Sequence, residues 1–184
     1  MKKLLLLPVL LAFAMMANAQ STEYHAFKVD IQLGYAIPNG SSGTGGTKAG
    51  VTFTIHPHYR LSDDLAVGLR FEGAGLGYVN TAQGTGTKVY LLTSYCPTIE
   101  YYFVKDGFRP FIGAGGGLVY QEAAGKGISS TGLVSGGSRF GAFPEAGFEF
   151  GHFRLSADYD VMGQNTNYLA FKIGAFFGGG TKKK

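Results

Sequence analysis

The chain has 184 residues, enough for one or two ordinary domains, and 30 of them are glycine, about twice the usual share. Its aromatic content of 14% excludes a disordered chain, and its glycines lack the three-residue period of collagen. A single cysteine excludes a disulfide framework and a multi-thiolate metal site, and the formal net charge is +4.

The N-terminal segment has the three parts of a secretory signal. Two lysines after the first methionine are followed by an apolar run over residues 4–16 and by Ala-Asn-Ala at residues 17–19. The apolar run is too short to span a bilayer as a retained helix. We therefore expect residues 1–19 to be cleaved after export across the inner membrane, leaving one domain over residues 20–184.

The positive charge belongs to the two ends of the chain. Setting aside the two signal lysines and the tail of Lys182, Lys183 and Lys184 leaves a body with a net charge of −1. A nucleic-acid partner needs a basic surface on the folded domain. We expect no such partner, and we interpret the last residues as a short basic tail.

From residue 27 onward, apolar and polar residues alternate with a period of two. In the first such segment Phe27, Val29 and Ile31 alternate with Lys28 and Asp30. This alternation predicts a strand with one apolar and one polar face. Eight segments follow the pattern, at residues 27–37, 51–61, 65–72, 89–103, 109–120, 139–150, 153–161 and 169–177.

All fourteen charged residues within these segments fall on the polar face, and seven are basic and seven acidic. A neutral set of charges suits an enclosed space in which each ion needs a partner. Asp158 and Asp160 form a candidate carboxylate pair or cation site, but we expect them to pair with Arg154. The predicted structural network of the lumen consists of Lys28, Asp30, Arg60, Arg70, Glu72, Glu100, Arg109, Arg139, Glu145, Glu149, Arg154, Asp158, Asp160 and Lys172.

The connections between the segments differ in length. Residues 38–49, 80–88 and 122–138 are long and rich in Gly, Ser and Thr, whereas residues 62–64 and 105–107 are short. Long loops at one rim and tight turns at the other are typical of outer-membrane barrels. A secreted lipocalin-like barrel would instead turn its apolar face inward. We predict an all-β fold, an eight-stranded antiparallel up-and-down transmembrane β-barrel with both termini on the periplasmic side.

Two features interrupt the alternation. Leu76 falls on the polar face within the glycine-rich residues 73–77, so we expect the third segment to change phase or leave the membrane there. Prolines lack the backbone N–H that a strand ladder needs. We expect a bulge or a strand end at each of Pro57, Pro97, Pro110 and Pro144.

Two glycine-rich segments resemble a known family. Residues 109–117 read Arg-Pro-Phe-Ile-Gly-Ala-Gly-Gly-Gly, and residues 143–149 read Phe-Pro-Glu-Ala-Gly-Phe-Glu. With the signal and the strand series, they resemble the OmpA/OmpX-type eight-stranded outer-membrane β-barrel family over nearly all of residues 25–178. The resemblance implies a bacterial outer-membrane location, contact with outer-membrane lipids and lipopolysaccharide, and recognition of Phe177 by the barrel-assembly machinery.

We expect a structural or surface-interaction role. An eight-stranded barrel is just wide enough to be filled by side chains, so fourteen charged ones disfavour a diffusion porin. The loops at residues 38–49, 80–88 and 122–138 are candidate sites for an extracellular ligand, because loops on a rigid barrel commonly carry binding. A small-solute channel and a lipid A-modifying enzyme remain the alternatives.

No catalytic, cofactor or metal site is expected. Ser94 and Ser156 lie on the polar face, but the sequence assigns neither of them a histidine base. His56 and His58 have the spacing of a metal clip on a strand, yet no third ligand is evident, so we expect ordinary lumen histidines. We interpret Cys96 as a small buried thiol.

Overall fold

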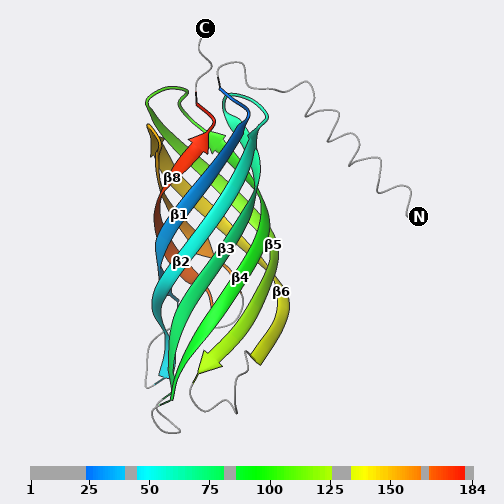
Figure 1. Cartoon of the computed structure of the whole chain (residues 1–184), viewed down its shortest axis with the longest axis vertical. Helices are drawn as coiled ribbons and strands as arrows, with labels where there is room; N and C mark the ends of the chain where they lie inside the picture. The colour runs from blue at the N-terminus through cyan, green and yellow to red at the C-terminus, as the bar shows by residue number, and fades with distance from the viewer. Residues whose placement is uncertain (1–23, 40–44, 81–85, 126–133, 163–165, 181–184) are drawn as a thin grey trace, which may run out of the picture.

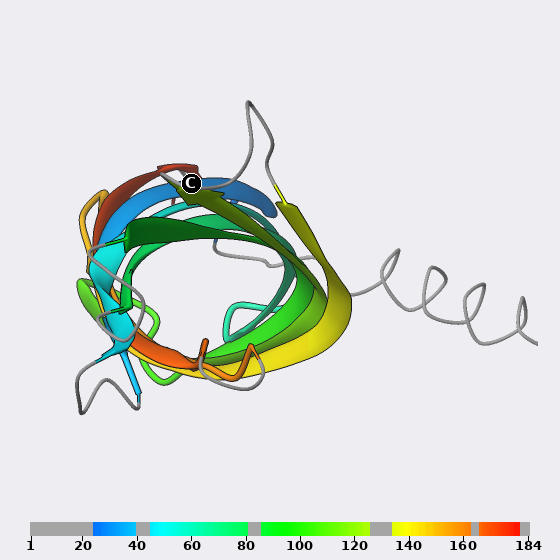
Figure 2. The same cartoon turned by 90° about the horizontal axis from the view of Figure 1, so that it is seen from below.

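The computed structural model describes residues 24–39, 45–80, 86–125, 134–162 and 166–180. Eight antiparallel strands form a closed barrel, in which each strand pairs with its neighbours in sequence and β1 pairs with β8 (Figure 1). Viewed along the axis, they form a continuous ring (Figure 2). The predicted fold class is confirmed. The strands are β1 (Phe27–Pro38), β2 (Gly45–Arg60), β3 (Leu65–Asn80), β4 (Gly86–Tyr102), β5 (Phe108–Gly125), β6 (Val134–Phe150), β7 (Phe153–Asp160) and β8 (Tyr168–Gly178).

The two ends of the barrel carry different connections. The short connections 61–64, 103–107 and 151–152 lie at one end, which we call the turn end. The beginning and end of the described chain meet there, where the His25 amide donates to the Gly180 carbonyl at 2.9 Å. At the opposite end, which we call the loop end, the chain passes from β1 to β2, from β3 to β4, from β5 to β6 and from β7 to β8. The predicted signal peptide and the basic tail lie outside the described residues.

The strands continue further toward the loop end than the apolar alternation indicates. β2 already begins at Gly45, which pairs with Asn80, and β5 continues to Gly125. Backbone pairing needs no apolar side chain, so the ladders extend beyond the segment that lipid makes apolar. The predicted boundaries are therefore wrong for all three long loops, residues 38–49, 80–88 and 122–138.

The third segment does not change phase, so the first of the two expected alternatives is wrong. β3 pairs with β4 in one register from Leu65 to Asn80, and Leu76 is fully buried in the lumen. The irregularity instead lies in the neighbouring strand, where the β2–β3 register shifts between Lys48 and Gly50. Leu76 is inward because the lumen is apolar at its height, as described below.

The prolines do not produce the expected bulges. Pro57 pairs with Val29 of β1, and the β2–β3 ladder skips past it without a change of register. Pro97 interrupts only the β4–β5 ladder, while Pro110 and Pro144 adjoin the ends of one ladder each. A strand residue donates its N–H to one neighbour only, so the ladder on the other side holds the register.

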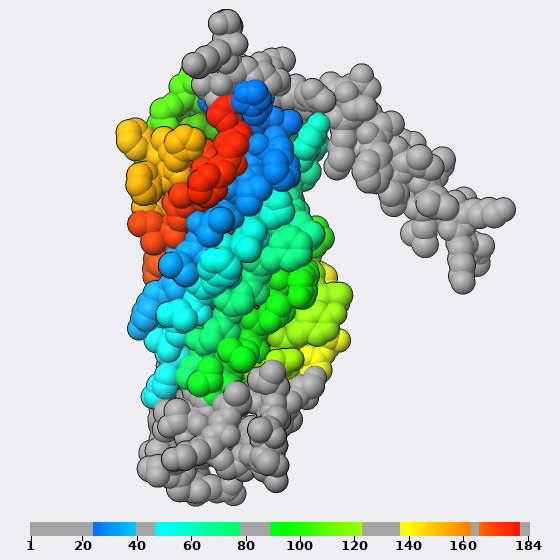
Figure 3. Space-filling view, viewed as in Figure 1, coloured from blue at the N-terminus to red at the C-terminus, as the bar shows by residue number. Residues whose placement is uncertain are grey.

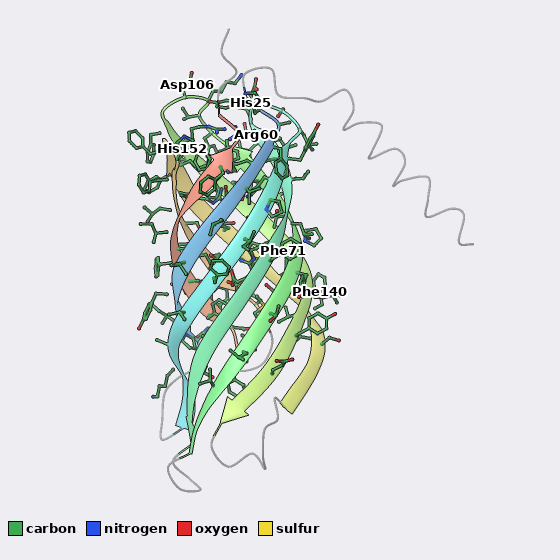
Figure 4. The ribbon with its side chains drawn as sticks, viewed as in Figure 1. His25, Arg60, Phe71, Asp106, Phe140 and His152 are labelled. Carbon is green, nitrogen blue, oxygen red and sulfur yellow. The ribbon has the colours of Figure 1, made fainter. Side chains whose placement is uncertain are left out.

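Large apolar side chains cover the outside of the barrel. Phe140, Leu33 and Ile173 are all more than half exposed, and Figure 4 shows Phe140 on the outer surface. The strands run as oblique bands packed side by side over this face (Figure 3). Within the described residues no helix is long and apolar enough to cross a membrane.

Candidate functional site: the filled lumen

The predicted lumen charges lie inside the barrel. Thirteen of the fourteen are 7% exposed or less, and Arg139 is half-buried. Since inward and outward residues alternate along each strand, an ion on the polar face points into the interior. Eleven of the fourteen form two clusters at different heights, which we describe in turn.

The cluster nearer the turn end centres on Arg154 of β7. Its Nη2 donates to Glu100 Oε1 at 2.6 Å and to Glu145 Oε1 at 3.0 Å, and its Nη1 donates to Glu149 Oε1 at 3.0 Å. The guanidinium carbon lies 3.8 Å from the centre of the Phe111 ring. One arginine therefore links carboxylates from β4 and β6 across the lumen, with an aromatic face behind it. The turn-side cluster, as we call it, consists of Lys28, Asp30, Glu100, Glu145, Glu149 and Arg154.

The second cluster lies nearer the loop end and contains Asp158 and Asp160. Asp158 Oδ2 accepts from Arg70 Nη1 at 3.1 Å and from Lys172 Nζ at 2.9 Å, and Asp160 pairs with Arg70. The expected pairing with Arg154 is wrong. Arg154 is four residues from Asp158 along the strand, about 13 Å, so basic side chains of β3 and β8 are nearer. We call Arg70, Glu72, Asp158, Asp160 and Lys172 the loop-side cluster.

The two lumen histidines contact each other and the turn-side cluster. Their ring centres are 3.6 Å apart, with His58 Nε2 2.8 Å from Asp30 Oδ2 and His56 Nε2 2.7 Å from Thr98 Oγ1. Asp30, His56 and His58 offer ligand atoms within 4.8 Å of one another. The same Asp30 oxygen also lies 3.2 Å from Arg154 Nη1, so the carboxylate already faces a cation.

An apolar layer closes the lumen on the loop side, and the alternation of the sequence does not predict it. Its members occupy the inward-facing positions of their strands, where polar residues are expected. The available signal is that Leu76 and Leu92 both lie in the half of their strand nearer the loop end, so that apolar inward residues gather at one level of the barrel. The layer consists of Ala36, Ala74, Leu76, Leu92, Val119, Met162, Tyr168 and Ala170.

The remaining predicted residues are placed as follows. Ser156 Oγ donates to Gln32 Oε1 at 3.1 Å, and Ser94 Oγ has no hydrogen-bond partner among the described residues. Neither serine is hydrogen-bonded to a histidine there. Cys96 is fully buried, and Phe177 is exposed on the outer face of β8.

The fold is similar to that of several solved structures, two of which we describe. The attachment invasion locus protein Ail of Yersinia pestis is 13% identical, with a TM-score of 0.52 over 84% of this chain and 99% of that chain. Neisserial surface protein A is 19% identical, with a TM-score of 0.51 over 82% of this chain and 94% of that chain. At these identities the likeness concerns the fold alone.

Comparison of the sequence with known proteins finds a matching family model but no matching curated protein. No curated protein sequence matches this chain. The model of the outer membrane protein beta-barrel domain matches residues 5–180. Because that match spans nearly the whole chain, the protein belongs to the outer membrane protein beta-barrel domain family, whose place is the bacterial outer membrane.

Proposed function

We propose that the protein is a closed structural barrel that carries binding hairpins at the cell surface and conducts no solute. The single observation behind this proposal is the filling of the lumen by three successive layers. A solute entering from the turn end meets the turn-side cluster, then the loop-side cluster, and finally the apolar layer.

The two ion clusters and the apolar layer resist passage for different physical reasons. Ions in the two clusters are held by partners from several strands, so moving one leaves a buried charge uncompensated. Leu76, Leu92 and Tyr168 in the apolar layer are each 2% exposed or less, and an ion crossing that layer would lose its hydration without finding polar partners. The two ion clusters and the apolar layer together favour a structural scaffold over a small-solute channel.

The hairpins at the loop end are the proposed binding elements. Outer-membrane barrels place their longer loops outside the cell, and loops on rigid barrels commonly carry binding. Paired strands carry these hairpins beyond the apolar belt, as the pairing of Ala123 with Val134 illustrates. Ail of Yersinia pestis was solved in complex with the heparin analogue sucrose octasulfate. We adopt that sulfated sugar as a probe, together with purified lipopolysaccharide.

The test combines planar-bilayer recording with a binding screen on folded protein. We expect no stepwise conductance, and we expect a deletion of residues 127–132 to weaken binding of whichever probe binds the intact protein. The matched control shortens the turn-end connection 103–107, which leaves the loop end unchanged. Reproducible conductance steps contradict the closed scaffold, and undiminished binding by the deletion variant contradicts the role of that hairpin.

An enzyme assay addresses the lipid A-modifying alternative separately. The folded protein is incubated with lipopolysaccharide, and the lipid A is examined by mass spectrometry. A scaffold leaves the lipid A mass unchanged. A mass change that disappears in the variant Ser94→Ala or Ser156→Ala would replace the scaffold role by catalysis.

A further inference from the structure

Two arginines lie between two tyrosine rings at the turn-end mouth of the barrel. The guanidinium carbons of Arg60 and Arg109 are 4.5 and 4.4 Å from the centre of the Tyr24 ring, and 5.3 and 4.4 Å from that of Tyr102. Figure 4 shows Arg60 at this end, near His25. The rings stabilise the two cations through their faces but accept no strong hydrogen bond in the guanidinium plane.

The guanidinium of Arg60 has no hydrogen bond within the described residues. It is 1% exposed, and none of its three nitrogens has a hydrogen-bond partner in that part of the chain. Its closest ion-pair contact runs from Nη2 to Glu149 Oε2, at 3.8 Å. Arg109 Nη1 is 3.5 Å from the same oxygen. Arg109 also donates from Nε to the Val104 carbonyl at 3.3 Å and from Nη2 to the Asp63 carbonyl at 3.4 Å. Buried donors of a charged group are costly to leave unpaired, so Arg60 in particular calls for an acceptor.

Glu149 holds neither arginine in a hydrogen bond. Its Oε1 accepts from Lys28, from Tyr102 at 3.0 Å and from Arg154 at 3.0 Å. Its Oε2, which faces the two arginines, makes no hydrogen bond within the described residues. Tyr24 supplies no negative charge either, since burial raises the pKa of its hydroxyl. At 3.8 Å the Glu149 Oε2 does not satisfy the Arg60 donors, which are left without a hydrogen-bonded acceptor among the described residues.

A cavity opens beside this pair. It has a volume of about 280 Å³ and is lined by Tyr24, Arg109, Glu149, Asp106 and His152, among others. A water molecule occupies about 30 Å³ of liquid, so the cavity has room for a group of several heavy atoms. Its rim also carries the Asp106 carboxylate, 3.4 Å from the Tyr24 hydroxyl, which opposes a bound anion.

The mouth lies at the level of a ring of outward aromatic side chains. In outer-membrane barrels such girdles mark the membrane interface, where lipid headgroups lie. The ring is formed by side chains at the turn-end limits of their strands or just beyond them. They are Phe27, Phe103, Phe108, Phe150, Phe153 and Phe177.

We propose that the turn-end mouth is an oxyanion site of the phosphate class, with Arg109 at its entrance and Arg60 behind Tyr24. The planar guanidinium fork of Arg109 lines the cavity and matches the spacing of phosphate oxygens, and the buried Arg60 adds a second positive charge behind the Tyr24 ring. Free phosphate and the phosphate of a lipid headgroup share this chemistry, and both reach the interface. The site is independent of the proposed surface role.

The test measures binding of inorganic phosphate to the protein folded in an uncharged detergent, titrated at constant ionic strength with chloride as the balancing anion. We expect Arg109→Gln to weaken binding about tenfold or more, since it removes charge-assisted donors at the cavity, and Arg60→Gln to weaken binding less, since it removes a positive charge behind Tyr24. Lys105→Gln is the matched control, because it removes an exposed cation from the same end. It should leave binding unchanged.

Asp106→Asn provides a result of the opposite sign. Asp106 is exposed in the turn between β4 and β5, so the variant should fold, and it removes a carboxylate that faces the cavity. We expect tighter phosphate binding, which structural damage would not produce. Folding of every variant is checked by the mobility of unboiled samples on gels. If Arg60→Gln does not fold, Arg109→Gln and Asp106→Asn still decide the outcome.

A second arm distinguishes the two sources of the phosphate. Lyso-phosphatidylglycerol is titrated beside a monoacylglycerol that lacks the phosphate. Binding of both inorganic phosphate and the lyso-lipid, weakened by Arg109→Gln, supports a site for either source, and binding of the lyso-lipid alone assigns it to headgroups. The proposal is overturned if neither phosphate compound binds, or if the arginine variants bind as well as the wild type.

Discussion

At the scale of single residues, Arg154 shows how this barrel uses buried charge. It contacts four carboxylates, those of Asp30, Glu100, Glu145 and Glu149, and all its nitrogens are within the lumen. Replacing a whole buried ion network by apolar groups is often neutral, whereas removing one partner leaves the others uncompensated. The stability of the network therefore depends on Arg154 more than on any peripheral pair.

The variant Arg154→Met tests this dependence. It keeps an unbranched side chain against Phe111 but leaves four carboxylates short of a cation, so we expect a loss of about 3–5 kcal/mol in the free energy of unfolding. The measurement is urea-induced unfolding in lipid vesicles, followed by gel mobility. Lys105→Gln, which breaks only the partly exposed 3.8 Å pair with Asp63, should change stability by about 1 kcal/mol or less. Equal effects of the two substitutions would contradict the role of Arg154.

Residue-scale packing also explains part of the high glycine content. At Gly117 of β5, an added Cβ would lie 2.9 Å from the Cα of Cys96, so only glycine allows this backbone approach. At Gly73 on the outer face of β3, nothing lies within 4 Å of the same added atom. Some glycines are therefore required by close strand packing, and others simply face open space.

At the scale of elements, each strand separates lipid from lumen by parity alone. The β7–β8 pair illustrates this separation. Leu155 faces Ile173 on the outside, while the neighbouring pair Ser156 and Lys172 faces the lumen. A single strand thus carries a lipid-facing surface and a polar one, which explains why charge on the wrong parity is costly.

A charge on the lipid face of β8 should have a cost that depends on depth. We expect Ile173→Arg, in the middle of the strand, to lower the free energy of unfolding by about 2–4 kcal/mol, and Phe153→Arg, at the turn end of β7, by about 1 kcal/mol or less. Both residues are more than half exposed on the outer face, so the pair differs mainly in depth. Unfolding in vesicles measures the difference. A cost independent of depth would place the membrane elsewhere along the barrel.

At the scale of the whole molecule, the closed ring and its filled lumen act together. Closure gives every strand a paired neighbour on both sides, as a barrel in lipid requires. The two ion clusters and the apolar layer then occupy the interior from the turn side to the loop side. Cys96 lies within this interior on β4, so the single cysteine of the chain is a natural reporter of access to the lumen.

We expect Cys96 to resist a charged, membrane-impermeant thiol reagent in the folded protein and to react fully after unfolding. The paired variant Leu92→Ala removes part of the apolar layer and should allow faster reaction from the loop side, because water can then enter. Labelling is quantified by mass spectrometry. Identical mobility of boiled and unboiled samples would show that no closed barrel had formed, and rapid labelling of folded wild type would contradict the sealed lumen.

Much of the fold was predictable from the sequence, because strands in lipid must alternate. Period-two alternation located all eight strands, and charge parity indicated which side chains turn inward, as Lys28 and Lys172 do. The strand ends at the loop side were not predictable, since pairing there continues through Gly and Thr residues that carry no apolar signal. The effect of proline was also misjudged at Pro57, because one lost N–H affects only one of the two ladders.

The sequence by itself determined the class of the barrel and the face on which each charge lies, since both follow from local alternation along one strand. Only the tertiary structure decided which charges meet. Arg154 binds Glu100 and Glu145, and Asp158 binds Arg70, because contacts across a lumen depend on the register and tilt of all eight strands together. The Arg60 side chain without hydrogen bonds among the described residues and the apolar layer around Leu76 have the same origin. Each depends on which side chains from several strands lie at the same level of the closed barrel, and no single strand specifies this.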